Sequence, residues 1–304
     1  MKPLKHAIKL ALLFILMSQG KPAWCQQQEA ALFLDDNRYT KGLEYKVMQA
    51  HKQQNGKAKP ALQRVAANIK EDMPAKINLP SEANKTILLP EQLYENRKKA
   101  VLMMGRLSND HRGPRAQLYA TGFILTEDGV CVTNRHVLAE LIDPVSPADS
   151  LASAKQQSIY FVQTYDGKVY LLDQILAYST INDVAIFRIK SGDQKHPYIP
   201  LGNALAPASP VHIIAHPNNN YFYYSQGVVA RNNRLSFPGS QQERWQMNVS
   251  ADYAVGSSGG PIMDQYGSVS GIVSSTLQIH PPNQYIQMVL KNAISVLAIK
   301  NLLN

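Results

Sequence analysis

The chain has 304 residues, of which 45% are hydrophobic and 17% charged, so it can bury a core as one large β domain or two smaller ones. Its formal net charge is +9, but four of the 31 basic residues precede the first acidic residue, and the other 27 face 22 acidic residues. Because the remaining excess of +5 is small and spread along the chain, we expect no nucleic-acid partner. The densest basic run, residues 97–99, is expected to be a solvated face.

The N-terminus has the pattern of a secretory signal peptide. Its positively charged start consists of Lys2, Lys5 and Lys9. An uncharged apolar run follows at 10–17, far below the roughly 18 residues that span a bilayer, so we expect no stable membrane insertion. Small residues suited to cleavage stand at Ser18 and Gly20 or at Ala23 and Cys25. We predict a signal peptide over 1–25 and a secreted or periplasmic protein. Lipidation at Cys25 is the alternative, disfavoured because bulky Trp24 stands where a small residue is expected.

Cysteine usage fits an exported protein without disulfides. Cys25 and Cys131 are the only cysteines, and cleavage after Cys25 leaves no intrachain pair. Cys131 lies in an apolar segment, where it is expected to be a buried small hydrophobe. The fold must then rely on its hydrophobic core.

Residues 26–90 are predicted to form a helical extension and linker. Helical spacing is shared by Leu62, Val65, Ala66, Ile69 and Met73, and 43–51 is a weaker helix candidate. Prolines at 74, 80 and 90 then interrupt a polar stretch, and a short helix over 91–104 runs into the first strand. The extension could be a propeptide, a brace or an oligomerisation arm.

From about residue 98 the chain changes to short strands separated by turns. Strands are predicted at 118–125, 130–133, 158–164, 168–172, 184–189, 210–215, 227–231, 245–249, 271–274 and 285–290. Such spacing is typical of all-β barrels or sandwiches. An amphipathic helix is predicted over 293–303, and because it follows so soon after the last predicted strand we expect no further module after it.

Three motifs supply the residue types of nucleophilic catalysis. Gly256–Pro261 reads as a serine in a glycine-built turn, and His136 and Asp183 precede it in the order His, Asp, Ser. A serine becomes a nucleophile when an adjacent base takes its proton, and that base needs an acidic residue to fix its tautomer. Each motif alone is weak evidence, but the three together favour a triad.

These motifs resemble those of the chymotrypsin-like serine proteases, nearest to the disulfide-free bacterial Deg-type proteases. The resemblance rests on 121–124 with 132–137, on 182–186, on 256–261 and on 271–274. It implies a protease domain over 91–304, with two six-stranded antiparallel β-barrels at about 98–195 and 196–290. It also implies protein or peptide substrates and no cofactor. A catalytically inactive, binding-only relative is the alternative.

The resemblance also implies roles for individual residues. Ser258 would be the nucleophile, His136 the general base and Asp183 its orienting acid, while Gly256 and Ser258 would donate their N–H groups to the oxyanion. Ser274 would support Asp183 and pair its backbone with substrate. Ser257 stands where digestive relatives carry an Asp that binds a newly freed N-terminus. Because Ser257 cannot make that ion pair, activation must work otherwise or the site is already organised on folding.

Two further features concern binding. Asp252 lies six residues before Ser258, where trypsin-type enzymes place a pocket acid, although Tyr253 and Thr276 depart from that pattern, and Asp252 could instead cap a turn or bond to backbone. Glutamate specificity is disfavoured, because no His stands in the strand at 271–276. His212 and His216 would share one face of a strand, but no third ligand is evident, so no metal site is expected. The sequence leaves the oligomeric state open.

Overall fold

The computed structural model describes residues 32–304 apart from 58, 81–85, 144–157, 238–241 and 281–284. The predicted signal peptide, with Cys25, lies outside these residues. The chain forms two compact units, 1–41 and 42–304. In the first, the described part contains the short helix α3, Asn37–Thr40. All other described helices and strands belong to the second unit.

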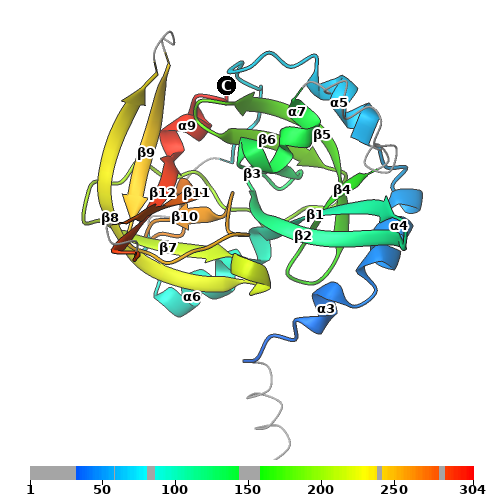
Figure 1. Ribbon diagram of the computed structural model, residues 1–304, viewed down its shortest axis with the longest axis horizontal. Coiled ribbons are helices and arrows are strands. Elements are labelled where there is room, and N and C mark those ends of the chain that lie inside the picture. The colour runs from blue at the N-terminus through cyan, green and yellow to red at the C-terminus, as the bar shows by residue number, and fades with distance from the viewer. Residues whose placement is uncertain (1–31, 58, 81–85, 144–157, 238–241, 281–284) are drawn as a thin grey trace, which may run out of the picture. The chain divides into compact units, whose positions relative to one another are not determined.

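Its first half is a closed antiparallel barrel with the strand order β1-β2-β3-β6-β5-β4 (Figure 1). The strands are β1 Val101–Asp110, β2 Gly113–Ile124, β3 Val130–Thr133, β4 Ile159–Gln163, β5 Val169–Ser179 and β6 Val184–Ile189. The β1–β2 hairpin pairs from Val101 with Phe123 to Asp110 with Gly113, with a shift of register between Met104 and Gly105. All four residues of β3 are buried, and the one polar side chain among them, Thr133, donates its hydroxyl to Thr121 O at 2.8 Å.

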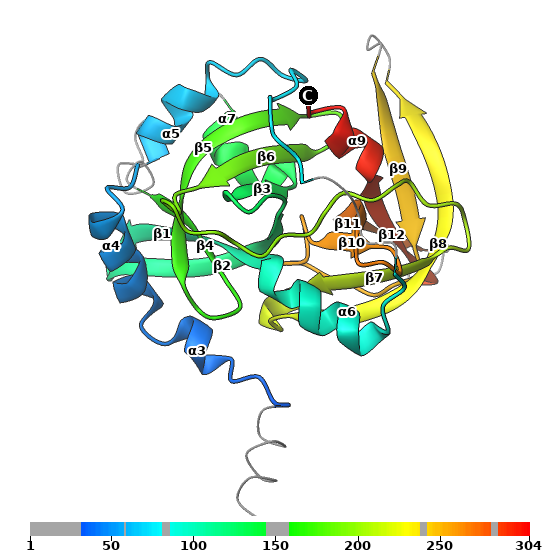
Figure 2. The ribbon, with the colours of Figure 1, turned by 180° about the vertical axis from the view of Figure 1, so that it is seen from behind.

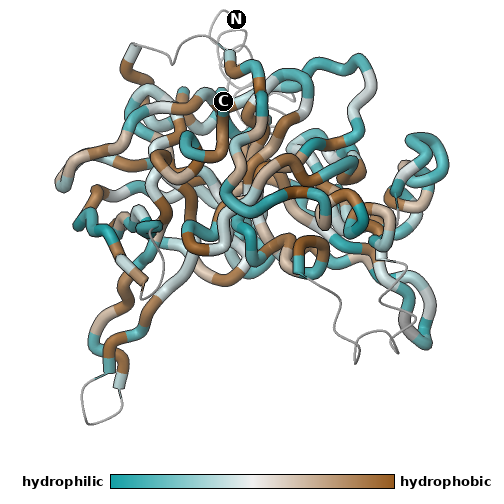
Figure 3. The backbone as a smooth tube through the Cα atoms, turned by 90° about the horizontal axis from the view of Figure 1, so that it is seen from above, coloured by the Kyte–Doolittle hydropathy of each residue, from teal (hydrophilic) through white to brown (hydrophobic). Residues whose placement is uncertain are grey.

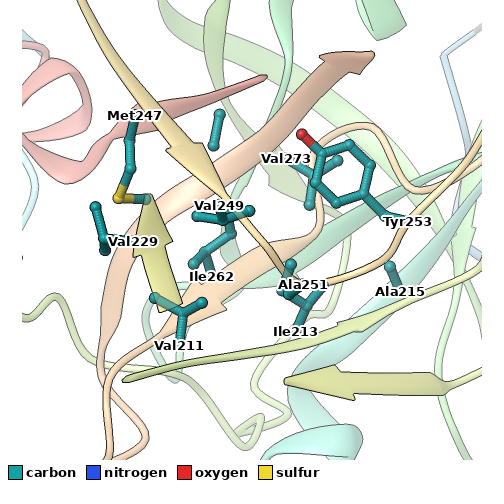
Figure 4. Packing of buried hydrophobic residues seen from close by; sticks show 11 residues of the cluster. Val211, Ile213, Ala215, Val229, Met247, Val249, Ala251, Tyr253, Ile262 and Val273 are labelled. Atoms are coloured by element: carbon teal, nitrogen blue, oxygen red, sulfur yellow. The ribbon is translucent and has the colours of Figure 1, made fainter. Parts of the chain in front are cut away.

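The second half is another closed antiparallel barrel, ordered β10-β11-β12-β9-β8-β7. Its strands are β7 Pro210–Ala215, β8 Tyr223–Ser236, β9 Glu243–Val249, β10 Pro261–Met263, β11 Val269–Ile279 and β12 Met288–Ser295. Alternate residues of one strand face the same side, so Val211, Ile213 and Ala215 of β7 all enter the core. There they meet Val249 and Tyr253 (Figure 4). The predicted all-β fold of two six-stranded barrels is therefore confirmed.

At the C-terminus, the boundary between the last strand and the last helix lies later in the chain than predicted. Strand β12 continues to Ser295, and helix α9, Val296–Lys300, begins only there, so the helix predicted from 293 is wrong in its first turn. Ala293 and Ile294 pair with β11 instead. The Ser295 hydroxyl accepts the Leu297 N–H and caps the shorter helix.

Helices α4, Leu43–Gln53, and α5, Lys59–Ala66, contact the first barrel (Figure 1). Val47 and Leu62 are buried in these helices. Helix α5 ends at Ala66 and not near 73 as the spacing predicted, because the Asn68 side chain donates to the Arg64 carbonyl at 3.0 Å and competes with the helix.

The linker contacts the C-terminal end of the domain. The Ala75 N–H of the linker donates to Leu302 O, and the Asn304 N–H donates to Ala75 O, both at 2.9 Å. Helix α6, Pro90–Arg97, then leads through a 3₁₀ turn, Lys98–Ala100, into β1.

Lys98 corrects the prediction of a solvated basic run. Its side chain is buried, with Nζ 2.6 Å from Glu95 Oε1 and over the rings of Tyr94 and Tyr165 at 4.8 and 4.5 Å. Aromatic faces and a carboxylate thus replace water around this cation. Only Arg97 and Lys99 of the run remain partly or fully exposed.

The segment between β6 and β7 crosses from one barrel to the other (Figure 2). Its Ile199 N–H donates to Ile124 O of the first barrel, and its Gly202 N–H donates to Val269 O of the second, at 2.9 and 2.8 Å.

Hydrophobic residues gather toward the interiors and hydrophilic ones in the outer loops (Figure 3). Within the described part of the chain, no helix combines the length and apolarity needed to cross a bilayer.

Candidate active site

His136 lies just beyond the first barrel's strand β3. The chain leaves β3 at Asn134 and turns through a short 3₁₀ helix, Arg135–Leu138, which carries the histidine. Buried Asn134 holds this exit in place, because its Nδ2 donates to the Asp183 carbonyl at 2.9 Å. The His136 side chain is 50% exposed, so one face of the imidazole is open to a substrate.

Asp183 lies on the turn between β5 and β6, with a left-handed backbone at φ +51°. Such a conformation is strained for a non-glycine residue and is often found where a side chain must be aimed. The Asp183 carboxylate accepts the His136 backbone N–H at 3.0 Å, and His136 Nδ1 lies 3.0 and 2.9 Å from its two oxygens. The Ser274 hydroxyl donates to Oδ2 at 2.9 Å.

These contacts fix the charge and the tautomer. Burial alone would raise the pKa of Asp183, but the hydrogen bonds from His136 and Ser274 bring that pKa below its ordinary value. Asp183 is therefore ionised at neutral pH and can only accept hydrogen bonds. His136 Nδ1 must then carry the proton, which leaves Nε2 as the basic nitrogen when the ring is neutral.

The turn before β10 places Ser257 and Ser258 in different surroundings. Ser257 is completely buried, and its Oγ accepts the Ala254 N–H at 3.4 Å. Ser258 is only partly buried, and its Oγ donates to the Ser274 carbonyl at 3.3 Å. Among the residues that the structure describes, Ser258 Oγ and His136 share no hydrogen bond. Ser258 is thus the more accessible of the two hydroxyls.

Thr121 of β2 attaches this turn to the first barrel. Its N–H donates to Ser258 O at 2.9 Å and its Oγ1 to Gly256 O at 2.8 Å. Gly259, at φ +84°, permits this approach, because a Cβ there would lie 2.3 Å from Thr121 O. The glycines of the motif therefore serve a close contact between the two barrels.

The peptide between Val255 and Gly256 is held in one orientation. Val255 O accepts the Asn218 N–H at 2.7 Å. Since N–H and C=O of a trans peptide point in opposite directions, the Gly256 N–H points away from Asn218. Within the described part of the chain, the N–H groups of Gly256 and Ser258 have no acceptor. Two unpaired donors at one turn can bind a negatively charged oxygen.

A cavity of about 210 Å³ adjoins this turn. Its lining includes Tyr119 and Ala120 of β2, together with Tyr221, Val255 and Gly256. The cavity could receive one side chain of a bound peptide.

The second barrel reaches the Asp183 turn through the β8–β9 hairpin. The Trp245 N–H donates to Asn182 Oδ1 at 3.1 Å, and Arg244 Nη2 donates to the Ser274 hydroxyl at 3.2 Å. Sequence analysis overlooked both contacts. Asn182 stands beside Asp183 and could have been found by its place in the motif, whereas no local pattern marks Arg244.

Asp252, the predicted pocket acid, is 81% exposed, and its Oδ1 lies 3.5 Å from Lys291 Nζ. Lys291 also donates to Tyr253 O at 2.6 Å. Buried Tyr253 donates its hydroxyl to the Asn292 and Ser275 carbonyls. A cation therefore already faces Asp252, which argues against a pocket that selects arginine or lysine by this carboxylate.

Both histidines of β7 and its exit have internal partners. His212 Nδ1 lies 2.7 Å from the Tyr224 hydroxyl, and His216 Nδ1 accepts the Phe222 N–H at 2.9 Å. The described residues contain no group of three His, Cys, Asp or Glu placed to hold a metal ion. Cys131 is a buried free cysteine, and burial raises the pKa of its thiol.

Comparison with known proteins places these residues in a family context. The model of the family described as "Trypsin-like peptidase domain" matches residues 120–272, half of the chain. Protease Do-like 5, chloroplastic, of Arabidopsis thaliana is 24% identical over 175 residues, which are 57% of this chain and 52% of that protein. An uncharacterized protein, y4bJ, of Sinorhizobium fredii is 26% identical over 159 residues, which are 52% of this chain and 22% of that protein.

The chain thus spans about half of the length of the Arabidopsis protease and about a fifth of the length of the Sinorhizobium protein. Among solved structures, one titled "Crystal structure of Deg5" is similar in fold, with a TM-score of 0.50 and 19% identity. That similarity covers 68% of this chain and 88% of the other.

Proposed function

Because the chain belongs to the trypsin-like peptidase domain family, we propose that it is an exported serine endopeptidase acting on protein or peptide substrates. The observation that carries the proposal is the hydrogen-bonded series from His136 through Asp183 to Ser274, whose carbonyl accepts the Ser258 hydroxyl. Export is supported by the charged and apolar pattern of residues 1–25. We propose no cofactor and no nucleic-acid partner.

The chemistry follows from the charge of each group. Ser258 Oγ attacks the scissile carbonyl while His136 Nε2 takes its proton, and Asp183 stabilises the resulting imidazolium. The N–H groups of Gly256 and Ser258 donate to the oxyanion. Collapse expels the amine, which receives the proton from His136, and leaves an acyl-enzyme that water hydrolyses by the same steps. For the first step, the Ser258 hydroxyl must exchange its hydrogen bond to Ser274 O for one to His136.

The second candidate function is that of a protease-fold protein that binds peptides without cleaving them. It applies if the Ser258 hydroxyl does not exchange its hydrogen bond to Ser274 O for one to His136. The observation in its favour is the hydrogen bond of Ser258 Oγ to Ser274 O, which leaves the hydroxyl without a described bond to its base. Apo sites often show long or misaligned catalytic hydrogen bonds, so this geometry is compatible with catalysis.

Hydrolysis by three purified proteins separates the two functions. The chain, Ser258→Ala and the matched neighbour Ser257→Ala are assayed on casein and a fluorogenic peptide library. We expect Ser258→Ala to lose on the order of 10⁶ in turnover, as a triad nucleophile does. Ser257→Ala should retain far more activity, because its hydroxyl transfers no proton. Equal, low hydrolysis by all three proteins would contradict the protease proposal and favour the binding protein.

A further inference from the structure

The guanidinium of Arg244 makes few hydrogen bonds within the described part of the chain. It lies on β9, half-buried, and the one described hydrogen bond of its side chain runs from Nη2 to the Ser274 hydroxyl at 3.2 Å. Its Nε is buried and has no partner among the described residues. A guanidinium carries five N–H donors, and a buried donor without an acceptor is unfavourable. A ligand from outside the chain cannot reach the buried Nε, but Nη1 has no hydrogen-bond partner among the described residues and can bind one.

The position of Arg244 is set by Ser274, which it shares with the candidate triad. The same Ser274 hydroxyl donates to Asp183 Oδ2 at 2.9 Å, and the Ser274 carbonyl accepts from Ser258 Oγ at 3.3 Å. The guanidinium is therefore one hydrogen bond away from the residue that contacts both the acid and the nucleophile. A ligand of Arg244 would lie beside the reacting bond.

Strand β11 offers a backbone edge at this place. Its neighbour β10 pairs only as far along β11 as Ile272, while β12 pairs with the other edge out to Ile279. Among the described strands, none covers the first edge beyond Ser274. An extended peptide can add to such an edge by main-chain hydrogen bonds, and its alternate side chains then meet the surface beside the strand.

From these observations we propose that Arg244 is a specificity-determining residue, which binds an acidic side chain of the substrate segment paired along β11 beyond Ser274. A carboxylate suits the site because it accepts two parallel hydrogen bonds from a guanidinium, and the two terminal nitrogens Nη1 and Nη2 can form such a fork. Lysine could not replace this geometry. The inference rests on the proposed peptidase function, since it assigns the substrate class of the same site.

The test compares kcat/KM for peptide pairs that carry Glu or its uncharged isostere Gln at one position at a time. The proteins are the parent chain, Arg244→Gln and Arg244→Lys. Arg234→Gln is the matched control, because Arg234 is on the same hairpin but 62% exposed and paired with Glu243. We expect the parent chain to prefer Glu by about tenfold or more at a single position, as charge-assisted hydrogen bonds would give. Arg244→Gln should lose the preference, Arg244→Lys should keep only part of it, and Arg234→Gln should retain it.

The outcomes also separate this inference from the proposed function. If the parent chain cleaves peptides but shows no preference for Glu at any position, or if Arg244→Gln slows the Glu and Gln peptides equally, the specificity role is overturned. The second result would make Arg244 a positioning residue that acts through Ser274. If the parent chain cleaves nothing and its Ser258 does not react with a fluorophosphonate, the proposed function itself has failed.

Discussion

Gly256 provides a sharp test of the proposed oxyanion site. Its backbone has φ +94°, and a Cβ added there would lie 2.5 Å from the carbonyl oxygen of buried His216, which cannot move as a flexible side chain would. Gly256→Ala therefore adds about 1–3 kcal/mol of backbone strain and must displace the turn. Loss of one oxyanion donor costs about 3–4 kcal/mol of barrier, or roughly 10²–10³ in kcat. We expect that loss in steady-state hydrolysis of a fluorogenic peptide.

Gly113 gives the matched control for this substitution. It has φ +106° in the β1–β2 turn, but a Cβ there would meet nothing within 4 Å. Gly113→Ala should carry a comparable backbone penalty, visible in thermal unfolding, while its kcat stays within about twofold of the parent. If folded Gly256→Ala turned over as fast as Gly113→Ala, the assignment of the Gly256 N–H to the oxyanion would be refuted.

Two further predictions concern stability. Complete burial lowers the pKa of His216 to about 3, against an opposing backbone hydrogen bond at Leu102, whereas the unfolded chain titrates near 6.5. Below pH 6.5 the unfolded state binds more protons at His216, so this residue alone should lower the free energy of unfolding by about 1.4 kcal/mol per pH unit toward pH 3. The pH slope of His216→Gln in denaturant titrations should be shallower than that of the parent by this amount, and equal slopes would contradict the prediction. Leu62→Ala in the extension should lower the free energy of unfolding by about 2–5 kcal/mol without raising kcat, while Met48→Ala, 41% exposed, changes little. Increased activity of Leu62→Ala would instead identify the extension as an inhibitory propeptide.

Local signals in the sequence were sufficient to predict an all-β fold, and the resemblance of the motifs to a known family predicted its two barrels. Alternating apolar residues predict strands, turn residues separate them, and the motifs around His136, Asp183 and Ser258 each fall at a strand end. The start of α9 could not be predicted, since the apolar spacing around Ile294 fits both a strand and a helix. Burial of Lys98 depends on Tyr165, a partner far along the chain.

Several features of the candidate site were also beyond sequence reasoning. The left-handed backbone of Asp183 is held by contacts of its turn, including the bond from Asn134, and not by a glycine. The contact of Arg244 with Ser274 depends on how β9 is placed in the barrel, for which no short motif exists. Asp252 stands at the expected spacing, but its pairing with Lys291 follows from the register of β9 and β12, in which Lys291 lies opposite Val249.

Covalent labelling of the intact chain by a fluorophosphonate, with the modified residue located by mass spectrometry, tests the central claim most directly. An activated serine reacts because its base removes the proton, so the reagent reports the triad without knowledge of the substrate. We predict stoichiometric modification of Ser258, lost in Ser258→Ala and strongly slowed in His136→Ala. Absence of labelling in the folded parent chain, or labelling of Ser257 in place of Ser258, would contradict the account.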